Sequence, residues 1–319
     1  MRAVVQDRYG PPEVLRIAEV EKPLPQPDQV LIRVRASVVS QTDAHIRGGH
    51  PAIWHLVAGF KKPRWPSLGV ALAGEVESVG EGVAEFKVGD RVFGAPPWVG
   101  AHAEYICLRE TAPIAVMPDG MTFADAAAIH DGATQALSAL RVARVVRGDR
   151  IVVYGASGAL GTAAVQIAKY WGAHVTGVCS TAHVELVRSL GADVVVDYTV
   201  ADFRAGGPFE SIIDAVGKYV FHRARPALKP GGIYVATDVG AVPIETILVA
   251  LFGRLFGTRR QKMSGGGRSQ ADTRLMKELI EAGALRPVID RTYPMAEVAE
   301  AHRYVETWRK AGNVVLTID

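Results

Sequence analysis

A glycine-spaced loop between an apolar run and an amphipathic stretch constrains the fold of this chain more than any other feature. The run covers 151–154, and the loop after it reads Gly155-Ala156-Ser157-Gly158-Ala159-Leu160-Gly161. In this context Gly155 permits a tight turn, Gly158 lets backbone N–H groups approach a pyrophosphate, and Gly161 allows the following helix to lie close to the strand. The pattern predicts a dinucleotide-binding strand–loop–helix unit.

The loop belongs to a longer alternation of strand-like and helix-like segments that begins after about residue 120. The second strand follows the loop at a distance of about 20 residues, so an ordinary strand-to-helix turn is the weaker alternative. Such an order predicts a parallel, helix-covered sheet of about six strands. The expected strands are 151–154, 174–178, 194–196, 211–214 and 233–236, with helices over 162–171, 183–190, 273–281 and 296–309 and a closing strand over 314–318.

The residues before about 120 follow a different pattern. Apolar and polar residues alternate in short runs such as 30–35, and proline and glycine recur between them, for example at Pro25, Pro27, Gly80 and Gly89. Alternation with a period of two, interrupted by turn residues, is typical of antiparallel strands. This half of the chain is therefore expected to form a turn-rich β domain.

Composition narrows the classes of ligand. The 319 residues are 49% hydrophobic and 22% charged, which is the composition of a globular protein with a large core. The net charge is 36 − 33 = +3, and the only basic run is the short 259–262, so no nucleic-acid surface is indicated. We expect a small-molecule ligand.

The cysteines and the longest apolar stretch indicate in which cellular compartment the protein is expected. Cys107 and Cys179 are too few for a disulfide framework or a cysteine-rich zinc site, so a reducing, cytoplasmic location is expected. The stretch Ala241–Phe256 is broken by Pro243 and Arg254, among others, and predicts no membrane span. It is instead expected to be a core, lid or subunit-interface helix.

The end of the second strand bears on which nicotinamide cofactor binds. Enzymes that use NAD carry an acidic residue there to hold the ribose hydroxyls, whereas this chain has Ser180, Thr181 and His183 and no carboxylate over 178–183. A 2′-phosphate would meet no repulsion and would find hydroxyl partners in Ser180 and Thr181, so NADPH is favoured. A helix start without any ligand is the alternative, since no Arg or Lys is adjacent.

Together with the β-rich first half, these residues resemble the medium-chain dehydrogenase/reductase superfamily, and within it the zinc-independent quinone-oxidoreductase-like branch that includes zeta-crystallin. The resemblance covers essentially the whole chain. It rests on Met1–Val5 with Tyr9-Gly10, Gly74–Val76 with Val79-Gly80, Val88–Gly94, Ala103–Tyr105, Gly155–Gly161, Gly191–Asp193 with Asp197-Tyr198, and Gly312–Leu316.

The resemblance implies an α/β protein with two domains. A GroES-like β domain, completed by the C-terminal segment, would cover residues 1–122 and 267–319, and a Rossmann domain with a doubly wound parallel sheet would cover 123–266. The active cleft would lie between them. By the same resemblance Tyr198 helps to hold the adenosine phosphate, with a structural role as the alternative. Val239 and Asn313 are further expected cofactor contacts.

The resemblance also bears on zinc. The zinc-dependent relatives carry a cysteine where this chain has Ser40 and a His-Glu pair where it has Val70 and Ala71. His130 stands at the position of the remaining cysteine ligand. At most one strong ligand is left of the three that a catalytic zinc site needs. No metal is therefore expected, and the substrate carbonyl would be polarised by hydrogen bonds.

Five residues are candidates for the chemistry. Thr134 matches the family threonine beside the nicotinamide, and Ser40 is a hydrogen-bond donor. Asp43 is either a catalytic group or a partner of the local backbone or Arg47. His130 and Asp131 replace the Pro-Leu of relatives. An imidazole near pKa 6.5 is suited to protonate an enolate, and the other side chain of the pair would cap a helix beginning near Gly132.

Aromatic side chains in the proline-rich loops of the first half are candidates for an apolar substrate pocket, with core packing as the equal alternative. Three of them, Trp54, Phe60 and Trp65, join Ser40, Asp43 and His130 in the expected pocket.

The function that these features favour is a zinc-independent, NADPH-dependent reductase that gives hydride to an enone, activated alkene or quinone, with a proton from His130, a hydroxyl or water. A carbonyl or alcohol oxidoreductase with the same cofactor is the first alternative. A non-catalytic NADPH-binding sensor or scaffold is the second. A small apolar conjugated substrate, no nucleic acid or membrane partner, and a homodimer are expected.

Overall fold

The computed structural model describes residues 1–319 except 51–54, 56–57, 218–220, 238–259 and 265–266. It divides into two compact units. The first unit contains Met1–Asp131, Arg268–Glu281 and Pro287–Asp319, and the second contains Gly132–Gly267 and Ala282–Arg286. Three expectations lie outside the described residues, namely those for Trp54, Val239 and the stretch 241–256.

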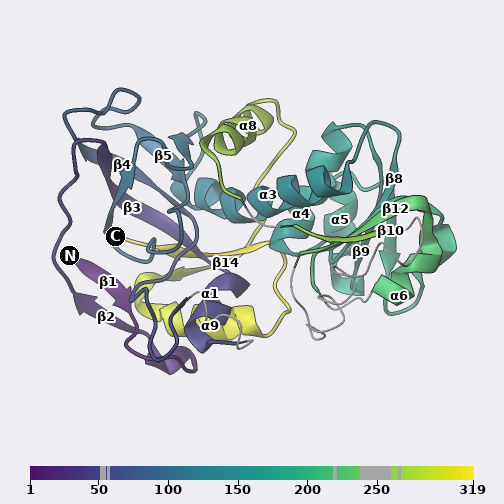
Figure 1. Ribbon diagram of the computed structural model, residues 1–319, viewed down its shortest axis with the longest axis horizontal. Helices are drawn as coiled ribbons and strands as arrows, with labels where there is room; N and C mark the ends of the chain where they lie inside the picture. Colours follow the sequence, from purple (N-terminus) through teal and green to yellow (C-terminus); the bar gives the residue numbers. More distant parts are fainter. Residues whose placement is uncertain (51–54, 56–57, 218–220, 238–259, 265–266) are drawn as a thin grey trace. The chain divides into compact units, whose positions relative to one another are not determined.

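The first unit is built on a seven-stranded sheet in which β14, β15, β3, β4, β5 and β7 follow one another, with β6 also paired to β3. Strands β3, β4, β5 and β14 are labelled in Figure 1. A separate antiparallel pair joins β1 to β2. The strands are β1 (Arg2–Val5), β2 (Arg16–Glu19), β3 (Gln29–Val39), β4 (Leu72–Val79), β5 (Arg91–Gly94), β6 (Tyr105–Arg109), β7 (Ile114–Val116), β14 (Ile289–Pro294) and β15 (Asn313–Thr317).

The C-terminal strand completes this sheet, as the family resemblance implied. Strand β15 runs antiparallel to β3, with Val314 opposite Val39 and Thr317 opposite Ala36. The strand expected over 30–35 is confirmed within β3, where Arg33 is exposed between the buried Ile32 and Val34, although Leu31 is buried as well. The GroES-like half of the fold prediction is therefore confirmed.

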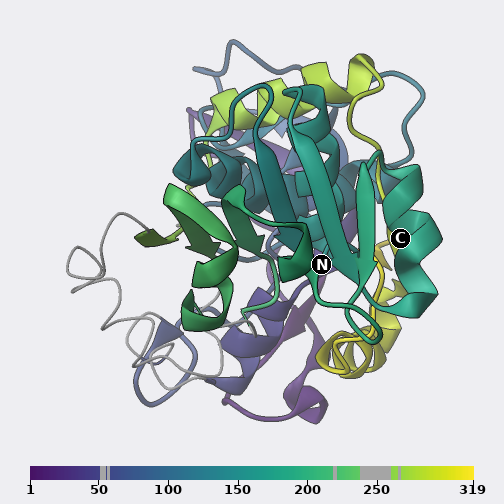
Figure 2. The ribbon, with the colours of Figure 1, turned by 90° about the vertical axis from the view of Figure 1, so that its right-hand side faces the viewer.

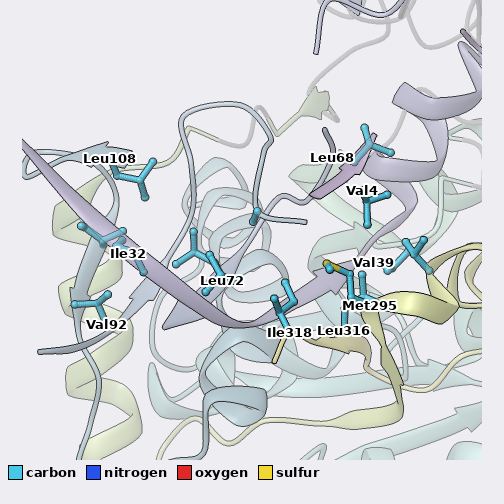
Figure 3. Packing of buried hydrophobic residues seen from close by; sticks show 14 of the residues in the cluster. Val4, Ile32, Val39, Leu68, Leu72, Val92, Leu108, Met295, Leu316 and Ile318 are labelled. Atoms are coloured by element: carbon cyan, nitrogen blue, oxygen red, sulfur yellow. The ribbon is translucent and has the colours of Figure 1, made fainter. Parts of the chain in front are cut away.

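Apolar side chains from these strands form one core (Figure 3). Ile32, Leu72, Val92 and Leu316 come from four neighbouring strands and are fully buried. Burial of each such side chain stabilises the fold by about 1.5–3 kcal/mol. The core therefore fixes the strand ends from which the candidate residues of this unit project.

The helices of this unit are η1 (Pro12–Val14), α1 (Gln41–Gly48), α8 (Gln270–Glu281), η6 (Met295–Glu297) and α9 (Val298–Glu306). The single helix expected over 296–309 is thus a short 3-10 turn followed by α9, which ends at Glu306. It ends there because Trp308 adopts a left-handed backbone conformation with φ of 59°. The Gln41 amide donates to Val305 O over 2.8 Å and links α1 to α9.

The second unit contains a six-stranded parallel sheet in the order β10, β9, β8, β11, β12, β13 (Figure 2). The strands are β8 (Arg150–Tyr154), β9 (His174–Cys179), β10 (Val194–Asp197), β11 (Phe209–Asp214), β12 (Leu228–Ala236) and β13 (Arg260–Met263). The helices with them are α4 (Ala159–Tyr170), η2 (Thr181–His183), α5 (Val184–Ser189), η3 (Phe203–Gly206), α6 (Phe221–Ala224) and η4 (Arg225–Ala227). The predicted Rossmann sheet is confirmed, and its sixth strand, β13, overlaps the basic run 259–262, where no strand was expected.

Helix α3 (Phe123–Ala143) corrects one expectation. It begins after Thr122, whose hydroxyl accepts from Asp125 N, and not near Gly132. His130 and Asp131 therefore lie inside a continuous helix, and neither caps one. Gly132 has a packing role instead, because a Cβ there would lie 2.4 Å from Ala159 O.

Among the helices of the described ranges, none combines the length and apolar character needed to cross a membrane.

Candidate cofactor and substrate site

The glycine-spaced loop turns sharply at the end of β8. Gly155 has φ of 82°, and a Cβ there would lie 2.2 Å from Val216 Cγ2. The backbone N–H groups of Gly155 and Ala156 both donate to Val178 O, over 3.0 and 2.9 Å. These bonds attach the loop to the end of β9, so both strand ends are held at one edge of the sheet.

The loop leads directly into α4. Gly158 occupies the N-cap position and has no side chain with which to cap the helix. The first N–H groups of a helix lack intrahelical partners and carry partial positive charge, so they bind anions. A Cβ on Gly161 would lie 2.1 Å from Gly155 O, which explains why the helix can approach the turn only with glycine here. The cradle fits a pyrophosphate, with Ser157, Ala159 and Leu160 on its partly exposed rim.

The residues expected near the adenosine ribose follow β9. Ser180 is half-buried, Thr181 is exposed, and His183 is half-buried at the end of the short turn η2. Their placement after the second parallel strand agrees with the sequence prediction. Tyr198 follows β10 and is 55% exposed, with its N–H donating to Cys179 O over 3.1 Å.

Sequence reasoning missed a carboxylate at this place. Asp197, the last residue of β10, pairs with Cys179 in the register of the sheet. Thr181 Oγ1 donates to Asp197 Oδ2 over 2.6 Å, and Thr199 N donates to Asp197 Oδ1 over 2.9 Å. These bonds, first among them that from Thr181, lower the pKa of the Asp197 carboxyl. The sequence signal that could have indicated this carboxylate is the pair Asp197-Tyr198 at the end of a predicted parallel strand.

Thr134 and Asn313 lie in different units. Thr134 is a buried residue of α3 in the second unit. Asn313 begins β15 in the first unit, and its side-chain amide donates to Val288 O over 3.2 Å. This bond gives Asn313 a structural role in joining β15 to the preceding segment.

Ser40 and Asp43 form a capping box at the start of α1. Asp43 N donates to Ser40 Oγ over 3.2 Å, and Ser40 N donates to Asp43 Oδ2 over 2.9 Å. The Ser40 hydroxyl also donates to Asp43 Oδ2 over 2.8 Å, and Gly69 N donates to Asp43 Oδ1. Asp43 therefore has the structural role that was one of the expected alternatives, because its carboxylate accepts from backbone N–H groups. The proton of Ser40 is directed to Asp43 in this arrangement.

Arg47, the other partner considered for Asp43, makes different contacts. Its guanidinium donates to Gly10 O over 3.0 Å and to Glu306 Oε1 over 2.5 Å. His302 Nδ1 lies 3.3 Å from Arg47 Nη1. The arginine therefore links α1 to α9.

His130 is buried and faces α8. Its Nε2 lies 3.0 Å from Thr273 Oγ1, and its ring meets that of Phe93 edge to face at 6.2 Å. Burial, with a smaller contribution from the charge of Arg268, lowers the pKa of His130 to about 3. The imidazole is neutral at pH 7, whereas the sequence hypothesis assumed a pKa near 6.5.

Asp131, the next residue of α3, forms an ion pair with Arg268. Its Oδ1 lies 3.6 Å from Arg268 Nη2, and Arg268 Nη1 donates to Pro96 O and Trp98 O. Burial raises the pKa of the Asp131 carboxyl, and the charge of Arg268 opposes that rise. Burial likewise lowers the pKa of Lys310 to about 8, against the opposing charge of Asp131. Arg268, Thr273 and Lys310 carried no sequence signal, because each is distant along the chain.

The described aromatic residues of the expected pocket differ in exposure. Phe60 is 79% exposed, whereas Trp65 is half-buried and stacks on Trp98 at 5.2 Å between ring centroids. Trp65 also packs against the core of the first unit. Core packing thus accounts for part of the role of Trp65.

The positions of zinc ligands in metal-dependent relatives hold other residues here. Ser40 bonds to Asp43, and Val70 and Ala71 are apolar and fully buried. Within the described ranges, no group of three or more His, Cys, Asp or Glu side chains is arranged to hold a metal ion.

Comparisons with known proteins agree with this fold. The sequence model of the alcohol dehydrogenase GroES-like domain matches residues 26–127, and that of the zinc-binding dehydrogenases matches 190–316. The mitochondrial NAD(P)H oxidoreductase RTN4IP1 of Mus musculus is 34% identical over 355 aligned positions, which cover 100% of this chain and 89% of that protein.

A second relative and a solved structure extend the comparison. The trans-enoyl reductase pgmF of Aspergillus terreus is 31% identical and covers 92% of this chain and 87% of its own. The quinone oxidoreductase structure from Coxiella burnetii superimposes with a TM-score of 0.89 at 27% identity, covering 100% and 99% of the two chains.

The fold and these relatives define a class of protein, the medium-chain dehydrogenase/reductases. The chain belongs to the quinone-oxidoreductase-like branch of that superfamily, and it is an oxidoreductase.

Proposed function

We propose that this protein is an NADPH-dependent reductase that transfers hydride to a conjugated acceptor, such as an enone, an activated alkene or a quinone. The observation that carries the proposal is the Gly155–Gly161 cradle, in which an uncapped helix start meets a turn too tight for any side chain. Relatives named as NAD(P)H, enoyl and quinone reductases support the reaction class.

The chain's own residues bind and orient the cofactor. The first-turn N–H groups of α4 would hold the pyrophosphate, and Ser180 would face the adenosine ribose. The family resemblance assigns Thr134 to the nicotinamide. When bound, the reduced nicotinamide supplies a hydride at its C4 atom. The lack of a carboxylate in 178–183 supports NADPH over NADH.

We infer that the reaction needs no zinc. Ser40, Val70 and Ala71 replace three strong ligands of metal-dependent relatives. The alkyl side chains of Val70 and Ala71 have no lone pair, and the Ser40 hydroxyl is bonded to Asp43. The acceptor oxygen would then be polarised by hydrogen bonds, which stabilise the charge that develops as hydride arrives.

The proton that follows hydride has to come from a group that is protonated near neutral pH. Burial keeps His130 neutral, and its Nε2 lies 3.0 Å from Thr273 Oγ1. We therefore assign the proton to water or a hydroxyl rather than to an imidazolium. His130 is retained as a residue of the expected pocket.

The experiment that tests the proposal is oxidation of NADPH and NADH by the purified protein with quinones, enones, saturated ketones or no acceptor, followed by the nicotinamide absorbance. Turnover with enones or quinones and not with saturated ketones is the expected result. Turnover of saturated ketones would instead favour the carbonyl oxidoreductase. Cofactor binding without turnover of any acceptor would favour the sensor.

A cytoplasmic location and a homodimer are also part of the proposal. Two cysteines without a disulfide support a reducing compartment, although the mouse relative is named as mitochondrial. Cell fractionation and sedimentation of the purified protein test the two expectations.

A further inference from the structure

A carboxylate lies beside the expected ribose site, although none occurs in the segment that follows β9. Strands β9 and β10 are parallel neighbours, and Asp197 at the end of β10 pairs with Cys179, which precedes Ser180. The carboxyl ends of parallel strands meet at one edge of the sheet, which is the edge where α/β proteins bind their cofactors. The neighbouring strand thus supplies the charge that β9 lacks.

Three hydrogen bonds hold this carboxylate in place. Thr181 Oγ1 donates to Oδ2 over 2.6 Å, and Thr199 donates to Oδ1 through its N–H over 2.9 Å and its hydroxyl over 2.7 Å. The bonds favour the ionised form, because they lower the pKa of Asp197. Asp197 is therefore a fixed negative charge at neutral pH.

The same bonds change what Thr181 can do. A phosphate oxygen accepts hydrogen bonds, so it needs a donor from the protein. The hydroxyl proton of Thr181 is directed to Asp197. Thr199 Oγ1 lies 3.2 Å from Thr181 Oγ1. Thr181 therefore presents mainly an acceptor, and the site is poorer in donors for a 2′-phosphate than the sequence suggests.

We propose that Asp197 is a specificity residue that weakens the preference for the 2′-phosphorylated cofactor, so that the enzyme accepts NADH as well as NADPH. The inference rests on the proposed function. A 2′-phosphate near Ser180 would be repelled by the carboxylate, whereas free ribose hydroxyls carry no charge and donate hydrogen bonds. Ser180 favours binding of the 2′-phosphate and Asp197 disfavours it, so the two residues together give an intermediate preference between NADPH and NADH.

The test is Asp197→Asn in the full-length protein. Asparagine keeps the size of the side chain and an oxygen for Thr199 N, but it removes the charge. Binding of adenosine 2′,5′-bisphosphate and of adenosine 5′-monophosphate is measured by calorimetry, and kcat/KM is measured with NADPH and NADH. The ratio of bisphosphate to monophosphate affinity and the ratio of kcat/KM with NADPH to that with NADH should each rise about three- to tenfold, the size expected for one partly screened charge.

Asp149→Asn is the matched control. Asp149 lies before β8, at the amino edge of the same sheet, and its carboxylate accepts from Val146 N. The same chemical change at that edge should leave the ratio as it is in the wild type. Thr181→Val, which removes a hydroxyl already directed to Asp197, should lower 2′-phosphate binding by less than about twofold.

The outcomes separate this inference from the proposed function. An unchanged ratio in Asp197→Asn, with both adenosine ligands still bound, would overturn the role of Asp197 and leave the reductase intact. Failure of the wild type to bind either ligand would instead overturn the proposed function. If Asp197→Asn does not fold, Asp197→Ser provides the same removal of charge, and the same rise in the ratio is required of it.

Discussion

His130 Nε2 lies 3.0 Å from Thr273 Oγ1 and joins the middle of α3 to the first half of α8. Thr273 Oγ1 also lies 3.3 Å from Ser269 O, to which it donates. The hydroxyl thus lies within hydrogen-bond distance of both the imidazole and a backbone carbonyl. Two residues separated by 143 positions thus form one buried polar contact.

Thr273→Val should destabilise the protein, because it removes the polar partner of the buried His130 Nε2. A free energy of unfolding lower by about 1–3 kcal/mol is expected in chemical denaturation. Thr292→Val, at an exposed position of β14, is the control and should change stability by less than about 0.5 kcal/mol. Equal effects of the two variants would show that the contact with His130 contributes nothing.

The depressed pKa of His130 predicts a loss of stability in acid. The folded state keeps the imidazole neutral down to about pH 3, whereas the unfolded chain takes up a proton below about 6.5. The stabilising contribution is therefore present above pH 6.5 and is lost as the pH falls through the range from 6.5 towards 3. Denaturation at pH 7 and pH 5 should show the stability gap between wild type and His130→Gln narrowing by about 2 kcal/mol. A gap independent of pH would contradict a buried, neutral imidazole.

His130→Ala should lower turnover with little loss of NADPH affinity, as expected for a residue of the substrate pocket. Since burial keeps the imidazole neutral, the pH profile of kcat between 6 and 8 should keep its shape in the variant. Loss of an ionisation near pH 6.5 from that profile would restore His130 as the proton donor.

Ser180→Asp should shift the preference from NADPH towards NADH. A carboxylate at the end of β9 would hold the ribose hydroxyls and repel the 2′-phosphate, and a change of about tenfold in the ratio of kcat/KM values is expected. Ser180→Asn, without the charge, is the control. An unaltered ratio in Ser180→Asp would mean that the ribose lies elsewhere.

Two glycines of the loop should respond differently to alanine. Gly161→Ala places a Cβ 2.1 Å from Gly155 O and should cost about 1–3 kcal/mol of stability, because backbone cannot yield as a side chain does. Gly158→Ala meets nothing closer than 3.6 Å and should fold normally, yet it should weaken NADPH binding by narrowing the approach to the backbone. Thermal unfolding and cofactor titration of both variants separate the two effects.

Metal analysis of the purified protein should find no stoichiometric zinc, and prolonged dialysis against a chelator should leave turnover unchanged. The basis is the replacement of three strong ligands by Ser40, Val70 and Ala71. One zinc per chain, lost in His130→Ala, would overturn the hydrogen-bond mechanism.

Features that depend on near neighbours along the chain were predictable from the order of the residues. The loop from Gly155 to Gly161, the parallel strands on either side of it and the β-rich first half follow from residue spacing, turn chemistry and hydrophobic period. Strand β13 was not predicted, because its four residues show neither the alternation of a strand nor a run of apolar residues. A helix start near Gly132, capped by His130 or Asp131, was the wrong expectation, because α3 begins at Phe123 and Gly132 lies inside it, close to Ala159.

The chemical state of the candidate residues, in contrast, depends on how distant parts of the chain pack together. A pKa and a hydrogen-bond direction depend on desolvation and on partners brought in from elsewhere in the chain. His130 is neutral because it is buried, and the Thr181 hydroxyl donates a hydrogen bond to Asp197 because β9 and β10 pair in one register. Residue spacing specifies which ionisable and hydrogen-bonding groups are available, whereas packing determines which of them are charged and which partners accept their hydrogen bonds.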